Sequence, residues 1–563
     1  MDSFQKYFDE NTLQVLALAP SVLVALVYAI PFLTVHASLA KYPGPVLAKF
    51  SRLWLAIKSR FGVRSLSVHE LHMKHGKFVR IGPNEVSIAD PAALPIVYGH
   101  GTGSLKADFY STKGVRRPDG MPCVRTSTDL TDRDYSIRLV VSRVWSSSAF
   151  VAVRTGLFNT RDRQEHTRKR KIVAHTFSQK SVQEFEPYIA ETVRLLLKKW
   201  DELCDRAKNG ASGGALKGYA VIETLDWYNA LAFDTIGDLA FGSPFGMLER
   251  DAADIVAITR EDGSVFHAPA VKILNERGEF SATQGALPPF IRPYTKYFDP
   301  WFARGLASVN NLSGIARHRV GKRLEEGSGD RKDILAHLLA ARDGEGKKMP
   351  RDELTAEALT QLIAGSDTTS NSSCAIMYYI VKNPRVHKKL QAELDEAFGA
   401  GGMDGVLDYA DVKALPYLQA CINEALRRHS TSGMGLPRLM TQETEVCGEV
   451  FKAGTILSVP SYTIHHLNEV WGDPWEYRPE RWLEQGGKDL ETKCLNIFSF
   501  GPRSCVGRNV AMMELLIFVA TFVYRYDFKL AEGENQQLEV AEGFLRKPLG
   551  CKMGIKRRTV EEI

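Results

Sequence analysis

The stretch FSFGPRSCVG, residues 498–507, decides how this chain is interpreted. It places Cys505 in a turn, with Gly501 and Gly507 on either side allowing tight backbone approach. The apolar run at 510–518 predicts a helix that begins just beyond the sulfur. Backbone N–H donors and the positive end of a helix both favour the ionised thiolate. The segment therefore suits a thiolate ligand, although a lone cysteine in a glycine-rich turn is more often a buried structural thiol.

The same segment closely resembles the haem-binding signature of the cytochrome P-450 family in the spacing of Phe, Gly, Arg, Cys and Gly. The resemblance implies a mainly α fold with small β-sheets, and Cys505 as the thiolate ligand of a haem b iron. It also implies that Arg503 reaches a haem propionate, that Phe498 covers the proximal face and that Gly507 belongs to the haem-binding turn. The implied activity is that of a haem-thiolate monooxygenase, in which the thiolate favours O–O cleavage.

A long helix predicted over residues 354–371 carries small and hydroxylic residues where a helix would prefer Ala or Leu. Ala364 and Gly365 leave room for dioxygen against the helix, and Thr368 can hydrogen-bond into a widened turn while Asp367 relays protons. This stretch resembles the oxygen-activation segment of the family, which makes Asp367 and Thr368 the candidate catalytic residues. A helix kinked at Gly365 for packing alone is the alternative.

Glu424 and Arg427 lie three residues apart on one predicted helix face, and Arg481 follows later in the chain. An exposed pair of this kind contributes only a few tenths of a kcal/mol. In the family, the corresponding three residues form a buried network. Breaking such a network costs roughly 3 to 5 kcal/mol, and we expect the product to be a misfolded protein that cannot retain haem.

The helical spacing of His166 and Arg170 puts them on one face, where the resemblance implies a propionate-binding pair. Many relatives have Trp at the first position, so His166 departs from the pattern. Arg438, which follows Leu436-Pro437, falls where relatives place another propionate ligand.

Three further cations of this segment, Arg168, Lys169 and Lys171, are expected to face outward on the proximal side. A run of charges is often only a solvated helix face. The functional alternative is that these residues dock an acidic flavoprotein that delivers electrons, the NADPH-dependent reductase that the family implies.

Composition describes ordinary globular material: 563 residues, 44% hydrophobic and 25% charged. A net charge of +6 is too small and too dispersed to suggest nucleic-acid binding. The eight cysteines show no CxxC and no zinc spacing, so those other than Cys505 are expected to be reduced thiols. Strand signals cluster at 78–81, 85–88 and 455–459.

The N-terminal segment lacks Asp, Glu, Lys and Arg from Asn11 to Ala40, and residues 13–35 are almost wholly apolar. As a helix this run spans about 35 Å, enough for a bilayer core of about 30 Å. We therefore expect a transmembrane anchor at 1–40 and a haem-thiolate domain at 41–563, a buried core helix being the alternative. Basic residues follow the segment rather than precede it, which favours the endoplasmic reticulum membrane with the catalytic domain cytosolic.

Within the larger family, the chain most resembles the fungal benzoate para-hydroxylases. The resemblance rests on Phe109-Tyr110 and on the segments 156–162, 231–242, 430–438 and 543–550. It implies para hydroxylation of benzoate or a substituted benzoate, a small aromatic acid, using O2 and NADPH-derived electrons. A buried carboxylate needs hydrogen-bond donors. The candidate donors are Thr431, Ser432 and Ser366, and the candidate apolar walls are Met434, Leu436 and Phe544.

Residues 111–148 do not fit this resemblance, since relatives run from Phe109-Tyr110 almost directly into the equivalent of Ala149. The stretch has arginines without period and no amphipathic face. We interpret it as an irregular insertion, either translated intron or a real loop that alters the roof over the haem.

Other functions remain open on sequence grounds: oxygenation of another small aromatic or phenolic substrate, peroxide rearrangement without dioxygen, or haem binding without catalysis. The rearranging enzymes usually lack a hydroxyl like that of Thr368, and a non-catalytic protein would need no Asp367-Thr368 pair.

Overall fold

The computed structural model describes residue 34 and residues 37–110, 155–208, 216–327, 329–344, 346–399 and 405–558. These residues form a mainly helical fold with small β-sheets, as predicted. Nearly all of the predicted anchor at 1–40 and the whole insertion at 111–148 lie outside the described residues. In the part that is described, no helix has the length and apolar character needed to cross a membrane.

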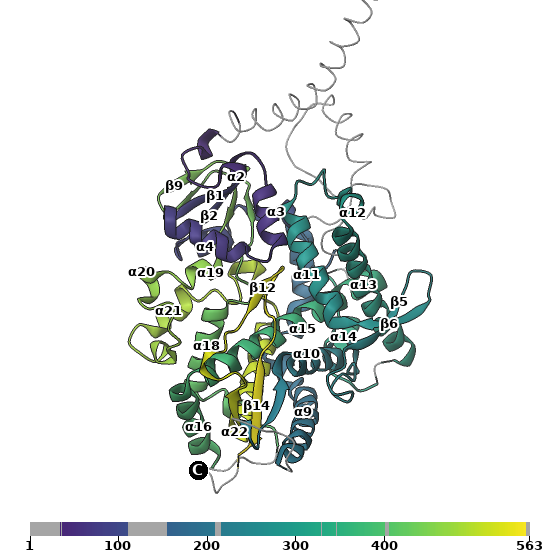
Figure 1. The fold of residues 1–563 in the computed structure, drawn as a ribbon. Helices are drawn as coiled ribbons and strands as arrows, with labels where there is room; N and C mark the ends of the chain where they lie inside the picture. Colours follow the sequence, from purple (N-terminus) through teal and green to yellow (C-terminus); the bar gives the residue numbers. More distant parts are fainter. Residues whose placement is uncertain are drawn as a thin grey trace, which may run out of the picture.

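Helices make up most of the described chain (Figure 1). They are α2 (Val46–Phe50), α3 (Leu53–Arg60), α4 (Arg64–His75), α5 (Ala93–Tyr98), α7 (Arg163–Thr176), α8 (Gln179–Gln183), α9 (Glu186–Arg206), α10 (Thr224–Phe241), α11 (Ala270–Ala286), α12 (Thr295–Phe298), α13 (Pro300–Glu326), α14 (Ile334–Ala340), α15 (Arg351–Lys382), α16 (Pro384–Phe398), α17 (Tyr409–Val412), α18 (Pro416–His429), α19 (Ser461–Ile464), α20 (Asn468–Trp471), α21 (Gly487–Lys493) and α22 (Arg508–Arg525).

The strands are short. They are β1 (Phe78–Gly82), β2 (Glu85–Ile88), β3 (Ser104–Lys106), β4 (Ala220–Glu223), β5 (Ile255–Thr259), β6 (Val265–Pro269), β7 (Arg438–Met440), β8 (Thr444–Val446), β9 (Glu449–Phe451), β10 (Ile456–Ser458), β11 (Tyr526–Leu530), β12 (Val540–Glu542), β13 (Arg546–Pro548) and β14 (Lys552–Arg557). In the described chain they form a sheet of order β1-β2-β10-β7-β3, a sheet of order β11-β14-β4, and three hairpins.

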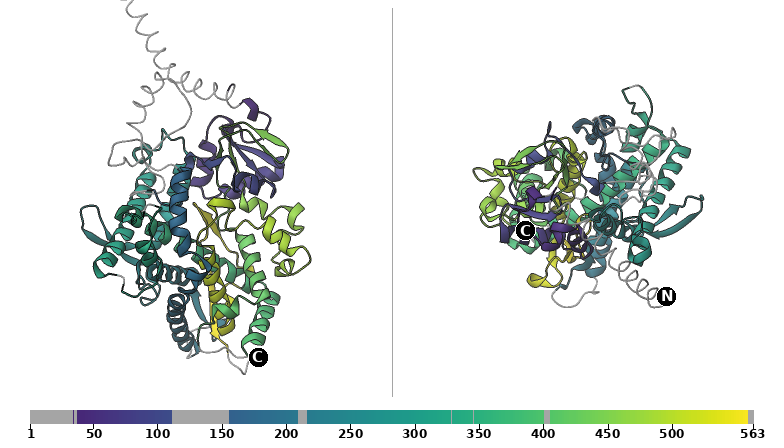
Figure 2. Two further views of the ribbon diagram at one scale, coloured as in Figure 1. Left: turned by 180° about the vertical axis from the view of Figure 1, so that it is seen from behind. Right: turned by 90° about the horizontal axis from the view of Figure 1, so that it is seen from above.

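The five-stranded sheet joins the two ends of the sequence. Its β1, β2 and β10 confirm the three predicted strands, and purple N-terminal strands lie beside green strands from late in the chain (Figures 1 and 2). The proline-rich segment before α2 is pinned to this sheet, because the N–H of Arg80 donates to the carbonyl of Pro43 at 2.8 Å. A Cβ at Gly44 would lie 2.1 Å from the carbonyl oxygen of Arg80, so this close approach requires glycine.

The predicted helix at 354–371 belongs to α15, whose 32 residues extend for about 48 Å and pack along α10. Gly365 allows that packing, since a Cβ there would lie 2.6 Å from the side chain of Ile236 on α10. Its small size therefore serves helix packing, whereas the neighbouring Ala364 is exposed. The expectation that Ala364 and Gly365 leave room for dioxygen stays a prediction.

The predicted network around Glu424 is present and buried. Glu424 accepts hydrogen bonds from Arg427 at 2.8 and 3.0 Å and from Arg481 at 3.0 Å. Trp482 adds its indole N–H at 3.1 Å. The network joins α18 to the segment before α21, so it fixes the approach to the loop that carries the cysteine.

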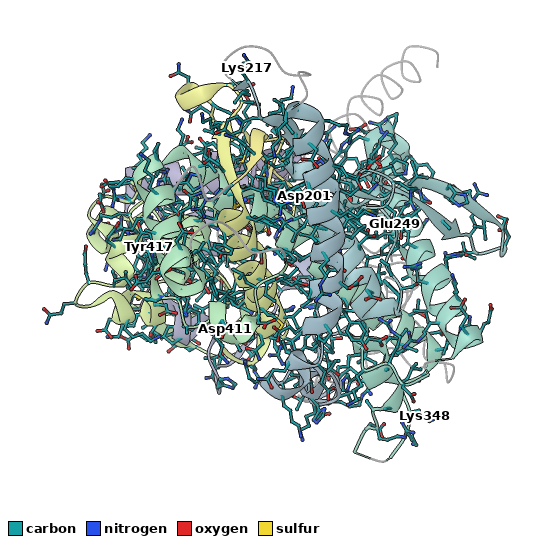
Figure 3. The ribbon with its side chains drawn as sticks, turned by 90° about the horizontal axis from the view of Figure 1, so that it is seen from below. Asp201, Lys217, Glu249, Lys348, Asp411 and Tyr417 are labelled. Carbon is teal, nitrogen blue, oxygen red and sulfur yellow. The ribbon has the colours of Figure 1, made fainter. Side chains whose placement is uncertain are left out.

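On the opposite side of the molecule from the five-stranded sheet, α9 packs against the C-terminal strands. Figure 3 labels Asp201 on this helix, beside the yellow strands. Asp201 accepts a hydrogen bond from the hydroxyl of Tyr526 at 2.8 Å and forms an ion pair with Arg525. These contacts fasten the end of α22, the helix that begins behind the cysteine loop, to the helical core.

Candidate functional site

The cysteine loop is a tight turn that ends where α22 begins at Arg508. The N–H of Cys505 donates to the carbonyl of Phe498 at 2.8 Å, which closes the turn. Gly501 has a φ of +68°, and a Cβ there would lie 2.1 Å from the carbonyl oxygen of Tyr98. Only glycine satisfies both conditions, so the sequence pattern of the loop follows from its backbone.

The Cys505 side chain is accessible, yet enough protein surrounds it that desolvation raises the pKa of its thiol. The N–H of Gly507 and the charges of Arg170 and Arg508 act in the opposite direction. Each cysteine that the structure describes is a free thiol, and Cys123 lies outside the described residues. A thiol in this setting becomes a thiolate when it binds a metal cation, which a haem iron provides.

Cations converge near this loop from three parts of the chain. The register of β3 and β7 places Lys106 opposite Arg438. Burial lowers the pKa of Lys106 well below its usual range, and the charges of Arg438 and Arg503 lower it further. Burial and then Arg503, Lys106, Arg170 and Arg438 lower the pKa of His166 to about 3, so the imidazole is neutral.

This cluster fits a ligand with two carboxylates. Arg438 Nη2 is buried and has no hydrogen-bond partner among the described residues. Arg438 and Lys106 are both almost fully buried, and a buried cation is costly without an anion. The propionates of a haem supply two negative charges, so the donor set and the cysteine together fit that group.

The structure places the other predicted haem-binding residues as follows. Arg170 donates to the carbonyl of Ser504 at 2.7 Å, so in this structure it supports the cysteine loop directly. Arg503 donates to the carbonyls of Thr160 and Arg161, the latter at 3.3 Å. Phe498 is half-buried, and the guanidinium of Arg508 lies 5.5 Å from the centroid of its ring.

One prediction for this segment is wrong. Lys169 does not face outward: its side chain is 2% exposed and its Nζ lies 3.1 Å from Glu353 and 3.5 Å from Glu357 of α15. Arg168 is half-buried and also binds Glu353, at 2.6 Å. Of the three cations, Lys171 remains exposed. The charge run therefore serves mainly to fasten α7 to α15, because acidic residues face it there.

The candidate catalytic pair lies midway along α15. Thr368 Oγ1 donates to the carbonyl of Ala364 at 2.6 Å, as predicted, but residues 351–382 are α-helical throughout, so the turn that accepts this bond is not widened. Asp367 is buried, with its Oδ1 2.7 Å from Lys547 Nζ and 3.1 Å from Asn371 Nδ2. Lys547, on β13, was not anticipated from the sequence, because only the tertiary fold brings that hairpin against α15.

An aromatic cluster contains the predicted apolar wall residues. Its buried members are Phe109, Tyr110 and Met434, and Phe158, Leu436 and Phe544 pack against them. Among the predicted polar candidates, Thr431 Oγ1 lies 3.0 Å from Ser372 Oγ, and Ser432 is half-buried. Ser366 is fully buried and donates to the carbonyl of Leu362 at 2.6 Å, so its proton is already used.

Lys106 is, after Lys547, a second site residue that sequence reasoning missed. Its ammonium lies 4.1 Å from the ring centroid of Phe158 and 4.5 Å from that of Tyr110, and it donates to the carbonyl of Phe158. It therefore links the cation cluster to the aromatic cluster. The sequence feature that could have indicated Lys106 is its place in a short strand just before the Phe109-Tyr110 pair.

Comparison with known proteins gives concordant matches. The family model for cytochrome P-450 matches residues 139–555. Benzoate 4-monooxygenase bphA of Aspergillus niger is 44% identical over 547 residues, covering 95% of this chain and 96% of the relative. The cytochrome P-450 monooxygenase gsfF of Penicillium aethiopicum is 29% identical over 537 residues, covering 93% and 94%. Another such monooxygenase, hepC of Aspergillus oryzae, is 30% identical over 502 residues, covering 87% and 88%.

Proposed function

Because this chain belongs to the cytochrome P-450 family, and is thus a haem-thiolate monooxygenase, we propose that it hydroxylates benzoate or a substituted benzoate at the para position. The observation that carries the substrate is the 44% identity, over nearly the whole of both chains, to a protein named for benzoate 4-hydroxylation. The aromatic cluster supports it, because its rings offer an apolar surface of the kind a benzene ring packs against.

When bound, a haem with a thiolate ligand supplies the activation of dioxygen that a monooxygenase requires. In this chain Cys505 would provide the thiolate. The buried cations Lys106 and Arg438 and the half-buried Arg503, with His166 beside them, would hold the propionates.

The role proposed for α15 is proton delivery at the oxygen-binding side. Thr368 carries the hydroxyl, held by the carbonyl of Ala364, and Asp367 is the adjacent acid. Such positioned groups typically contribute about 10²- to 10⁴-fold to the rate of a proton-transfer step. This pair also favours a monooxygenase over a peroxide-rearranging enzyme or a non-catalytic haem protein, neither of which needs it.

Electrons are proposed to come from an NADPH-dependent flavoprotein reductase that docks near the cysteine loop. Lys171 of α7 and Arg508 at the start of α22 are exposed cations in this region. Arg508 is close enough to lower the pKa of the Cys505 thiol. An acidic partner surface suits these charges, and its docking rate would fall as salt is added.

Membrane attachment is proposed from two features. The first is the apolar N-terminal run, followed by basic residues, which favours an anchor in the endoplasmic reticulum with a cytosolic catalytic domain. The second is a set of exposed apolar side chains on α2, on and just after α3, and on residues 290–298, which end with α12. These elements lie at one end of the molecule in Figure 1. The exposed apolar and aromatic side chains there are Val46, Leu47, Phe50, Leu53, Ile57, Phe61, Phe290, Tyr294, Tyr297 and Phe298.

A spectral titration tests the substrate. Benzoate added to the oxidised, haem-loaded protein should displace an iron-bound water and shift the haem absorption band with saturable dependence on concentration. A shift with a small phenol but none with benzoate would favour the alternative of another aromatic or phenolic substrate.

A further inference from the structure

A small buried cavity lies behind the aromatic cluster, between the N-terminal helices and the end of α11. Its volume is about 10 Å³, which is close to what one water molecule needs. Its walls come from distant parts of the chain and include Leu55 of α3, Arg64 of α4, Glu85 of β2, Phe109, and Gly285 and Ala286 of α11. We refer to it as the Arg64 chamber.

Arg64 is the notable member of this chamber. Its side chain is fully buried, the residue being 3% exposed, and its Nη1 has no hydrogen-bond partner in the described part of the protein. The guanidinium carbon lies 5.6 Å from the centroid of the Phe109 ring. A guanidinium stays charged in proteins, and a buried charge without a hydrogen bond is costly. The arrangement therefore calls for an anion or another acceptor at Nη1.

None of the neighbouring carboxyl groups accepts a hydrogen bond from Arg64 Nη1. Asp108 accepts two hydrogen bonds from Arg52, at 2.8 and 2.7 Å. Glu542 accepts a backbone N–H at the start of α4 at 2.7 Å. Glu85 Oε1 is buried without a hydrogen-bond partner in the described chain; burial raises the pKa of Glu85, which favours its neutral form, although the charges of Arg52 and Arg64 act in the opposite direction. Arg64 Nη1 thus keeps its capacity to bind a further acceptor.

Phe109 is the wall shared by the chamber and the aromatic cluster. Its ring centroid lies 5.2 Å from that of Tyr110 and 6.4 Å from that of Phe544. We propose that the Arg64 chamber is the recognition point for the carboxylate of the aromatic acid, with Arg64 Nη1 as the donor that receives it. This inference rests on the proposed function, since it takes an aromatic acid as the substrate. A guanidinium matches a carboxylate in both charge and geometry.

The size of the chamber adds a condition. Space for one water molecule does not hold a carboxylate, so the Phe109 ring has to turn when the acid binds. The Phe109 ring packs directly against the backbone of α11 at Gly285, because a Cβ added to this glycine would lie 2.7 Å from the ring. The alternative is that Arg64 is purely structural and reaches Glu85 through a single water.

The test compares benzoate with benzamide, its neutral isostere, by spectral titration of the full-length, haem-loaded protein. A lost charge-assisted hydrogen bond should raise the benzoate Kd of Arg64→Gln roughly 10-fold or more. The benzamide Kd should change less than about 2-fold, since the neutral amide cannot form an ion pair with Arg64. Arg64→Lys should recover part of the benzoate affinity. Arg60→Gln removes one positive charge from an exposed position on α3 and should leave the Kd of both ligands unchanged.

Two outcomes would overturn the proposal: an unchanged benzoate Kd in Arg64→Gln, or an equal loss of affinity for benzoate and benzamide, which would mark Arg64 as structural. If Arg64→Gln fails to hold haem, Arg64→Lys decides in its place: a loss confined to benzoate supports the proposal, and a loss shared by both ligands contradicts it. Failure of the unaltered protein to bind benzoate would instead contradict the proposed function itself, and with it this inference.

Discussion

Lys547 Nζ lies 2.7 Å from Asp367 Oδ1, so the acidic residue of the proposed proton-delivery pair is held by a cation from the hairpin that also carries Phe544 toward the aromatic cluster. Lys547 also donates to Asn275 Oδ1 on α11 at 2.6 Å. One lysine therefore ties together α15, α11 and the C-terminal hairpin at the point where protons are needed.

Lys547→Gln should uncouple NADPH consumption from product formation, because Asp367 loses the contact that fixes its position. We expect the fraction of NADPH converted to product to fall roughly 10-fold, within the range that positioned proton-transfer groups contribute. Peroxide should rise to match, as it should in Thr368→Ala. Lys552→Gln, at an exposed position on β14, is the matched control. Unchanged coupling in Lys547→Gln would remove Lys547 from the proton path.

Lys106→Gln should weaken haem retention. The substitution removes a buried cation from the proposed propionate site, and a charge-assisted hydrogen bond is worth about 1.5–3 kcal/mol, or roughly 10-fold or more in haem dissociation. Transfer of haem to a scavenging globin measures this rate directly. Lys106→Arg keeps the charge and should stay close to the unaltered protein. Equal transfer rates for all three proteins would show that Lys106 does not hold the haem.

The stability of the fold should fall as pH rises toward neutrality because of Glu514. This residue is buried on α22, where burial raises its pKa from 4.5 to about 7 and a 2.8 Å hydrogen bond from Thr369 lowers it. Between these two values the folded state keeps a proton that the unfolded chain has released. The free energy of unfolding therefore decreases with rising pH across this window, by up to ~1.4 kcal/mol per pH unit.

Glu514→Gln removes this titration and isolates its effect. Denaturant unfolding of the variant between pH 5 and 7 should show a flatter dependence on pH than that of the unaltered protein. Parallel curves for the two proteins would show that Glu514 does not titrate in this range.

Arg427→Ala should prevent accumulation of haem-containing protein. Arg427 makes two bonds to Glu424 and further bonds to the carbonyls of His465 and Pro474, at 2.6 and 2.8 Å. Stranding these buried groups costs roughly 3–5 kcal/mol, a large share of a typical domain's stability. The reduced carbon-monoxide band reports correctly ligated protein. As a control, Gln419→Ala at an exposed position on the same helix should keep the carbon-monoxide band. If Arg427→Ala also keeps the band, the network does not have the proposed structural role.

Local patterns predicted the parts of the site that short segments define. The cysteine turn, the helix at 354–371 and the Glu424 network all depend on spacing within a segment or between two segments, and the structure contains each of them. The parts missed depend on strand register and on packing between distant segments. Lys106 gains its role by lying opposite Arg438, and Lys169 turned inward because Glu353 and Glu357 of α15 face it. No periodicity in either segment carries that information.

Formation of 4-hydroxybenzoate tests the central claim most directly. The full-length protein, loaded with haem and supplied with an NADPH-dependent flavoprotein reductase, should convert benzoate to 4-hydroxybenzoate. Cys505→Ser should abolish both this product and the reduced carbon-monoxide band. NADPH use that yields another isomer or no hydroxylated benzoate at all, in a preparation with the intact band, would contradict the proposed function.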